Sequence, residues 1–139
     1  PYVQELRGDI FMKLNKADDA AKAYQRALKL DPEKSSTIQV AYGQALMLSG
    51  QGEAAVSQLK TALQRDKDNS LGYQYLAQAY GQAGDVGNAE LSTADMHYYS
   101  GNIQQAKIFA ARAQRSFKTG SPGWLRADDI IKAKVKKKK

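Results

Sequence analysis

Cysteine is absent from this 139-residue sequence, and histidine occurs only once, at His97. Without cysteine the chain forms no disulfide and no thiolate metal site, although this leaves its compartment open. His97 has only Glu90 and Asp95 as nearby carboxylates in the sequence and no second imidazole, so we interpret it as a helix-packing or surface residue. No apolar run approaches the roughly 18 residues that a membrane-spanning helix needs.

Catalytic patterns are also lacking. No serine or lysine has an evident partner base, and no glycine-rich phosphate loop occurs. The adjacent carboxylates Asp18-Asp19 and Asp128-Asp129 fall in the first turns of expected helices, where neighbouring side chains do not face each other and the charge offsets the helix dipole. An enzyme is therefore the least favoured interpretation.

Positive charge is concentrated at one end of the chain. Residues 1–103 hold 10 Lys or Arg and 12 Asp or Glu, whereas residues 104–139 hold 11 and 2. We interpret residues 136–139 as a solvated basic tail, with binding to nucleic acid or an anionic membrane as the alternative. Because the sequence begins at Pro1-Tyr2 without a basic and apolar leader, we expect a fragment or a processed product.

A turn signal recurs along the chain at intervals of 35, 34 and 17 residues, at Asn15, Gly50, Gly84 and Gly101. A small residue stands seven positions before each turn, at Gly8, Gly43, Ala77 and Ala94. An alanine stands five positions after each turn, at Ala20, Ala55, Ala89 and Ala106. Asn and Gly tolerate the left-handed conformation that ends a helix, and small residues let two helices approach closely. The pattern predicts helical hairpins.

A period near 34 residues is typical of the tetratricopeptide repeat (TPR). The first copy resembles that repeat through Gly8, Phe11, Ala20, Tyr24, Ala27 and Pro32. We therefore predict an all-α fold, a right-handed TPR solenoid of antiparallel hairpins with about 8 helices, a shortened fourth repeat and a C-terminal cap. The expected helices cover about residues 2–13, 17–30, 53–65, 71–83, 87–100 and 103–117, with a last one from Pro122. A further helix, for which Ser35, Ser36 and Thr37 are candidate N-caps, includes Ile38 and stops at Gly50.

The predicted domain is a single unit over residues 1–135, followed by the tail at 136–139. Its repeats cover about residues 1–34, 35–68, 69–100 and 87–118, and the cap helix covers 121–135 with Ser121 as N-cap and Trp124, Leu125 and Ala127 on one side. The helix over 87–100 belongs to two repeat frames. We expect helices to pack on both of its sides and to leave a local pocket around Tyr98, Tyr99 and the cap.

Two further segments, QAKIFAARAQ (105–114) and GSPGWLRADDI (120–130), together with the shortened repeat, resemble one branch of the family. They are similar to the C-terminal TPR module of periplasmic HExxH zinc metallopeptidases of the BepA (YfgC) type. The resemblance implies a periplasmic location and an upstream peptidase domain that carries the zinc, whereas no HExxH, metal site or cofactor belongs to this chain. The implied partners are that peptidase domain, the β-barrel assembly machinery and outer-membrane protein clients, with no specific nucleic acid and at most a peripheral membrane contact.

The first helix of each hairpin lines the concave groove in TPR proteins, and transfer of the family's groove positions gives a candidate protein-binding site. It consists of Tyr2, Asp9, Met12, Gln44, Met47, Gln74, Gln78, Gln82, Tyr98 and Tyr99. The carboxylate clamp of chaperone-binding TPRs is absent, because its Asn positions hold Asp9, Gln44, Gln78 and Asp95. Amide side chains suit the backbone of an extended peptide, while Met and Tyr adapt to apolar side chains; each Gln equally fits a solvated helix former.

A second candidate is a basic edge formed by Lys107, Arg112, Arg115, Lys118 and Arg126, which suits an acidic partner or simply keeps a helix soluble. Together these features predict a non-catalytic protein-interaction module that docks a protease onto the assembly machinery and its clients. The alternatives are an intramolecular scaffold that regulates the peptidase domain, or a generic TPR adaptor in another pathway.

Overall fold

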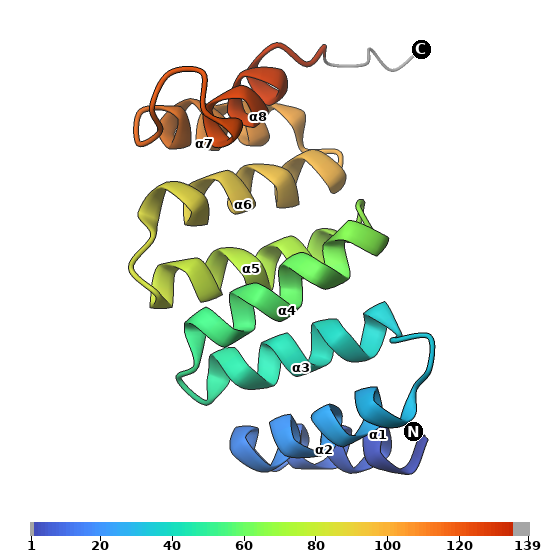
Figure 1. The fold of residues 1–139 in the computed structure, drawn as a ribbon. Coiled ribbons are helices and arrows are strands. Elements are labelled where there is room, and N and C mark those ends of the chain that lie inside the picture. Colours follow the sequence, from blue (N-terminus) through green and yellow to red (C-terminus); the bar gives the residue numbers. More distant parts are fainter. Residues whose placement is uncertain (1, 135–139) are drawn as a thin grey trace. The chain divides into compact units, whose positions relative to one another are not determined.

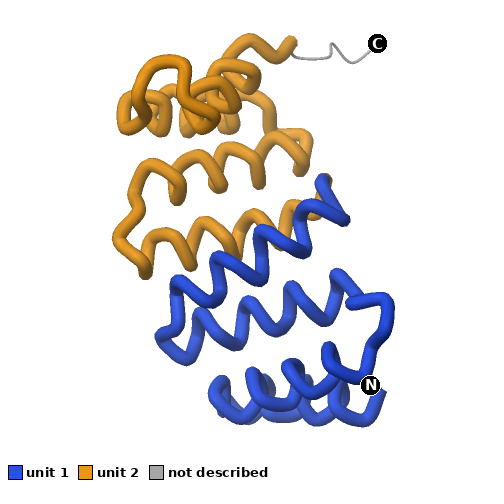
Figure 2. The backbone as a smooth tube through the Cα atoms, in the orientation of Figure 1, with its two compact units in different colours: residues 1–67 blue, residues 68–139 orange. Residues whose placement is uncertain are grey.

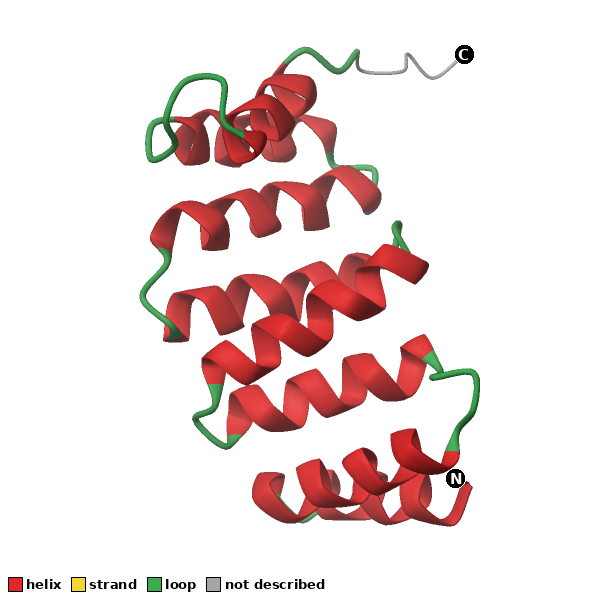
Figure 3. Ribbon diagram, in the orientation of Figure 1, coloured by secondary structure: helices red, strands yellow, loops and turns green. Residues whose placement is uncertain are grey.

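The computed structural model describes residues 2–134, and every regular element in that range is a helix (Figures 1 and 3). The eight helices are α1 (Tyr2–Lys13), α2 (Ala17–Leu30), α3 (Ser36–Leu48), α4 (Gly52–Arg65), α5 (Ser70–Gln82), α6 (Val86–Tyr99), α7 (Ile103–Gln114) and α8 (Pro122–Ile131). The predicted all-helical TPR fold is confirmed.

The chain divides into two compact units, residues 1–67 and 68–139 (Figure 2). In the first unit α1 packs on α2, α2 on α3 and α3 on α4. In the second, α6 packs against both α5 and α7, and α8 contacts α7 and α6. The expectation that the helix over 87–100 has packing partners on both sides is confirmed, whereas the single-domain boundary at residue 135 stays a prediction.

The four recurring turn residues all adopt the left-handed backbone conformation. Their φ angles are 57° at Asn15, 81° at Gly50, 82° at Gly84 and 85° at Gly101. Most L side chains are strained in this region, whereas Gly has no Cβ and Asn tolerates it, which explains why these turns carry Gly or Asn. The turn spacing read from the sequence therefore reflects a backbone requirement.

The small residues before the turns mark close helix contacts. A Cβ at Gly8 would lie 2.4 Å from the Tyr24 ring, and one at Gly43 would lie 2.5 Å from Leu59. Leu59 and Tyr24 are 0% and 2% exposed, so each large side chain of the second helix fills the space that the glycine of the first helix leaves. Three of the four alanines that follow the turns, at 20, 55 and 106, are fully buried.

Side-chain caps mark the starts of α3, α5, α6 and α8. Ser35 and Ser121 accept hydrogen bonds from the backbone N–H groups of Ile38 and Trp124, and Asn69 and Asp85 cap α5 and α6 in the same way. These oxygens satisfy N–H groups that have no partner inside the helix. Ser35 is the cap among the three candidates for α3, and the predicted N-cap at Ser121 is confirmed, with Pro122 opening α8 as expected. Asp128 and Asp129, which we expected in the first turn of a helix, lie near the end of α8 instead.

Two helix ends were predicted wrongly. α8 ends at Ile131, before the predicted end of the cap helix at residue 135. α7 stops at Gln114 rather than at Phe117, because the N–H groups of Ser116 and Phe117 turn to the carbonyls of Ala113 and Gln114, three residues back. Phe117 lies beyond the helix, and its ring packs against Gly123. A Cβ added at Gly123 would lie 2.7 Å from the Phe117 ring. Val135 and the tail 136–139 lie outside the described residues.

Candidate functional site

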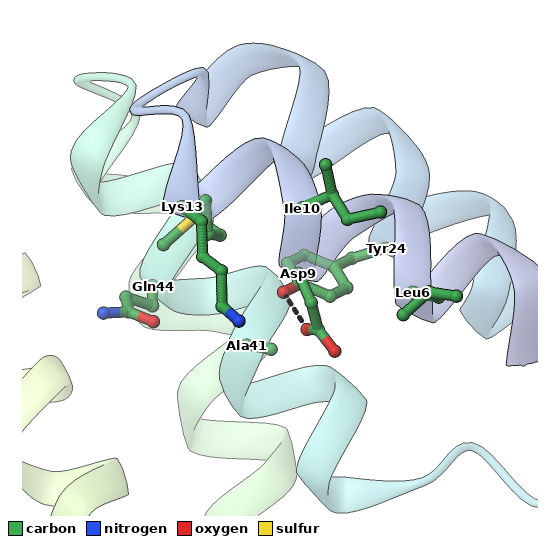
Figure 4. A pocket seen from close by; sticks show the side chains of 8 residues that line it. Leu6, Asp9, Ile10, Lys13, Tyr24, Ala41 and Gln44 are labelled. Carbon is green, nitrogen blue, oxygen red and sulfur yellow. Dashed lines mark hydrogen bonds between the residues drawn. The ribbon is translucent and has the colours of Figure 1, made fainter.

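A hollow of about 450 Å³ opens in the first unit between α1, α2 and α3. Figure 4 shows its lining side chains, which come mainly from α1. They are Leu6, Asp9, Ile10, Met12, Lys13, Tyr24, Ala41 and Gln44. Three of the predicted groove residues, Asp9, Met12 and Gln44, therefore line one site.

Asp9 and Tyr24 set the polar geometry of this hollow. The Tyr24 hydroxyl donates a hydrogen bond of 2.6 Å to Asp9 Oδ1, drawn as the dashed line in Figure 4. Burial raises the pKa of Tyr24, and the hydrogen bond to Asp9 and its negative charge raise it further. The phenol therefore stays a donor and fixes the orientation of an otherwise exposed carboxylate.

The rest of the hollow combines apolar side chains with one charged and one amide side chain. Leu6, Ile10, Met12 and Ala41 supply apolar surface. The Lys13 ammonium donates hydrogen bonds, while the Gln44 amide both donates and accepts them. Such a lining offers hydrogen-bonding groups to backbone amides and contact surface to apolar side chains.

A second cluster lies in the second unit, around an ion pair between α6 and α8. Arg126 donates to Asp95 Oδ1 from Nε at 2.9 Å and from Nη2 at 2.7 Å. Burial raises the pKa of Asp95, and the guanidinium opposes that shift. Burial opposes the charge of Arg126, but the attraction and the hydrogen bond of Asp95, together with the nearby Tyr99 and Tyr73, raise its pKa.

Three tyrosines surround this ion pair. The rings of Tyr73 and Tyr99 stack at 5.2 Å, and Tyr98 meets Tyr99 edge-on at 5.1 Å. The Arg126 guanidinium lies 5.2 Å from the Tyr98 ring centre and 5.9 Å from that of Tyr99, within the range of cation–π attraction. The cap helix thus places an arginine at Tyr98 and Tyr99, where we expected a pocket.

The other predicted groove residues do not converge on either cluster. Tyr2 is 74% exposed, whereas Met47 is buried. Gln74, Gln78 and Gln82 are exposed along α5.

The predicted basic edge does not form one continuous set. Arg126 belongs to the ion pair with Asp95, and Arg112 pairs with Glu90 at 3.1 Å while lying 5.2 Å from the centre of the Phe109 ring. Lys107 is half-buried, and Arg115 and Lys118 are exposed. The single histidine, His97, stacks on Phe109 with ring centres 5.4 Å apart.

Sequence reasoning missed several members of these clusters. Leu6, Ile10 and Ala41 line the hollow, but they belong to no groove position that we transferred. Asp95 and Arg126 are 31 residues apart, so no short sequence motif indicates that they pair. The one available clue was an apolar face on α1 opposite its small residue, Gly8.

Residues 2–134 contain neither a metal-binding cluster nor a membrane-spanning helix. No group of three or more His, Asp or Glu side chains in that range is placed to hold a metal ion. None of the helices within it has the length and apolar character required to cross a bilayer.

Comparison with known proteins identifies the family. The sequence profile described as "Cytochrome c-type biogenesis protein H TPR domain" matches residues 5–105, and no curated protein matches the chain. The resemblance to BepA-type metallopeptidases was wrong. It rested on repeat residues common to TPR proteins and on a cap motif at 120–130 that lies outside the matched range. The partners that this resemblance implied are therefore no longer supported. They were the peptidase domain with its zinc, the β-barrel assembly machinery and the outer-membrane clients. The match covers well over half of the 139 residues, so the chain belongs to the cytochrome c-type biogenesis protein H TPR domain family.

Proposed function

We propose that this chain is a non-catalytic protein-binding module in cytochrome c-type biogenesis, and that the hollow between α1, α2 and α3 is its binding site. The family match supports the process, since the family consists of TPR domains of the cytochrome c-type biogenesis protein H. The observation that carries the site is the convergence of Asp9, Met12, Lys13 and Gln44 around one opening of about 450 Å³. This corresponds to the adaptor alternative of the sequence analysis.

The chemistry of the hollow favours a polypeptide segment over a free carboxylate. Tyr24 holds the Asp9 carboxylate in place, and that negative charge repels a C-terminal carboxylate while it attracts an amide N–H or a cationic side chain. Gln44 satisfies a backbone amide in both directions. Met12 has a flexible, polarizable side chain that packs against apolar groups of different shapes.

The proposal is tested with a fluorescently labelled, haem-free c-type cytochrome polypeptide as the probe, its binding measured by fluorescence anisotropy. The double variant Met12→Ala/Gln44→Ala is expected to weaken binding about tenfold, because truncation of central interface residues costs on the order of 1–2 kcal/mol. The matched control is Lys60→Ala/Gln64→Ala, two exposed residues of α4 that do not line the hollow. Circular dichroism of each variant establishes that the helices are retained.

Equal affinities for the hollow variant and the α4 control would refute the proposed site. A wild-type chain that does not bind the probe would refute the proposed partner class. The periplasm stays the predicted compartment. It is tested by fusing the full-length protein to a reporter that is active only in the periplasm, and an inactive fusion would exclude that location.

A further inference from the structure

A second hollow opens in the first unit, on the side of α3 that faces away from the candidate site. It has a volume of about 230 Å³, and its lining comes from α2, α3, α4 and the loop between α2 and α3. The helical repeat of 3.6 residues places its residues Gln39 and Tyr42 on the other side of α3 from Ala41 and Gln44 of the candidate site. The lining of this second hollow, here called the back hollow, is Gln25, Leu28, Lys29, Lys34, Gln39, Tyr42 and Gln58.

Gln39 has a buried polar atom without a partner. The residue is 7% exposed, and its Oε1 accepts no hydrogen bond from any of residues 2–134. A buried carbonyl oxygen that loses water without gaining a donor lowers the stability of the fold. Because the terminal torsion of a glutamine side chain is soft, a small rotation of the Gln39 amide brings Oε1 to a donor placed in the back hollow. An N–H group of a ligand would complete the site.

The charged side chains of the back hollow are both cationic. Lys34 Nζ donates to the Leu28 carbonyl at 3.0 Å, which holds this ammonium at the hollow, and Lys29 comes from the last turn of α2. The acid between them in the sequence, Asp31, accepts hydrogen bonds from two backbone N–H groups of its own loop, at 3.0 and 2.6 Å. Among the described residues neither lysine forms an ion pair, so the hollow attracts a carboxylate.

We propose that the back hollow binds an extended polypeptide segment through an aspartate or glutamate residue. The side-chain carboxylate pairs with Lys29 and Lys34, and the backbone N–H donates to Gln39 Oε1. The backbone carbonyl accepts from the Tyr42 hydroxyl or the Gln58 amide. A residue within a chain supplies all three groups, whereas a terminal residue has no separate carbonyl and sulfate has no donor. This site goes beyond the function proposed above, since the candidate site repels a carboxylate.

The neighbouring surface has room for the rest of such a segment. The back hollow shares Gln25 and Tyr42 with an adjoining hollow of about 340 Å³. That hollow contains one acid, Asp18, and one base, Lys22, and the rest of its lining is uncharged. From Asp18 to Lys29 the helix α2 rises about 16 Å, which is the length of about five residues of an extended chain. We therefore expect the acidic residue at the lysine end of a segment of about that length.

The test follows the side-chain amide resonances of the nitrogen-15-labelled chain by NMR during a peptide titration. The probe is N-acetylated, C-amidated Gly-Ser-Gly-Glu-Gly-Ser-Gly, whose central glutamate allows either chain direction. Saturable shifts are expected at Gln39 and Gln58 and not at Gln44. A peptide with glutamine in place of the glutamate is expected to bind about tenfold more weakly, because the charged partner of the lysines is lost. Absence of saturable shifts at Gln39, or shifts at Gln44 instead, overturns the proposal.

A third peptide separates the two sources of a carboxylate. It carries glutamine at the centre and a free carboxylate at its C-terminus. Weaker binding than that of the glutamate peptide supports the side-chain assignment. Binding that is equal or tighter assigns the back hollow to a chain terminus and overturns the proposal.

Two variants test the residues of the back hollow. Gln39→Met keeps the length of the side chain but removes the unpaired oxygen, so it is expected to weaken binding about tenfold and to raise the melting temperature by a few degrees. Unchanged binding overturns the proposal, as does a melting temperature that does not rise, because Oε1 then has a partner in the folded chain. Lys29→Gln is expected to weaken binding of the glutamate peptide alone. The matched control is Arg26→Gln, an exposed base of the same helix that lines neither hollow, and equal losses in these two variants overturn the proposal.

Discussion

Arg126 Nη2 lies 2.7 Å from Asp95 Oδ1, and this contact joins the cap helix α8 to α6 across 31 residues of sequence. Asp95 is 8% exposed, so its carboxylate has little access to water and depends on the guanidinium for compensation. The pair therefore couples the end of the chain to the core of the second unit.

Removal of the guanidinium is expected to destabilise that unit. Arg126→Ala should lower the free energy of unfolding by about 1.5–3 kcal/mol, because hydrogen bonds to a charged group are lost and a nearly buried carboxylate keeps no cation. Urea denaturation followed by circular dichroism measures the change. Arg112→Ala, which breaks the exposed pair with Glu90, is the control and should cost less than about 1 kcal/mol. Similar losses in both variants would contradict the assigned role of the Asp95 pair.

The ionisation of Asp95 gives a pH-dependent signature. Burial raises its pKa, so the folded state holds the proton more strongly than the unfolded chain does. The stability that this proton provides is complete below the unfolded value of about 3.9 and is lost as pH rises through the folded pKa. A carbon-13 titration should find the pKa of Asp95 raised, and Arg126→Gln should raise it further. A pKa at or below the ordinary value in both proteins would contradict the burial argument.

Tyr24 is expected to weaken the fold at alkaline pH. Its pKa is raised by burial and by Asp9, so the unfolded chain loses the phenolic proton first as pH rises above about 10, and stability falls from there. Tyr24→Phe should abolish this part of the alkaline loss while costing about 1 kcal/mol at neutral pH for the hydrogen bond to Asp9. Urea denaturation at several pH values measures both. An unchanged alkaline slope in the variant would show that Tyr24 does not cause it.

The glycines at helix contacts should respond oppositely to a glycine in open space. Gly8→Ala and Gly43→Ala place a Cβ within 2.4 Å of the Tyr24 ring and 2.5 Å of Leu59, and each is expected to cost about 1–3 kcal/mol through overpacking. Gly81 in α5 has no atom within 4 Å of an added Cβ, so Gly81→Ala should stabilise by about 0.5–1 kcal/mol. Thermal unfolding compares the three. A stabilised Gly8→Ala variant would mean that α1 and α2 separate without penalty.

The fold was predictable because its signals are local. Asn15 and Gly84 mark backbone positions that few residues tolerate, and Ser121 followed by Pro122 marks a helix start. The end of α7 was not predictable in this way. Phe117 continues the apolar spacing of the helix, but its side chain packs beside Gly123 after the chain has turned.

The candidate sites depend on contacts that the sequence does not display. Asp9 and Gln44 were placed through family groove positions, yet their apolar neighbours Leu6 and Ala41 follow from no such position. Arg126 was counted as a surface cation because nothing near it in the sequence indicates a buried partner. The family was mistaken for a similar reason, since a motif in the cap outweighed the repeats that define the matched profile.

The only tryptophan of the chain, Trp124, is half-buried in α8, where Gln114 Nε2 donates to its carbonyl oxygen at 3.4 Å. Intrinsic fluorescence excited at the indole therefore reports on the second unit alone, whereas far-ultraviolet dichroism reports on the helices of both. Coincident melting curves from the two signals would reveal that the units unfold as one cooperative body, and separate curves would give each its own transition. Because Trp124 lies in the second unit, one melting experiment that records both signals measures whether the two units unfold together.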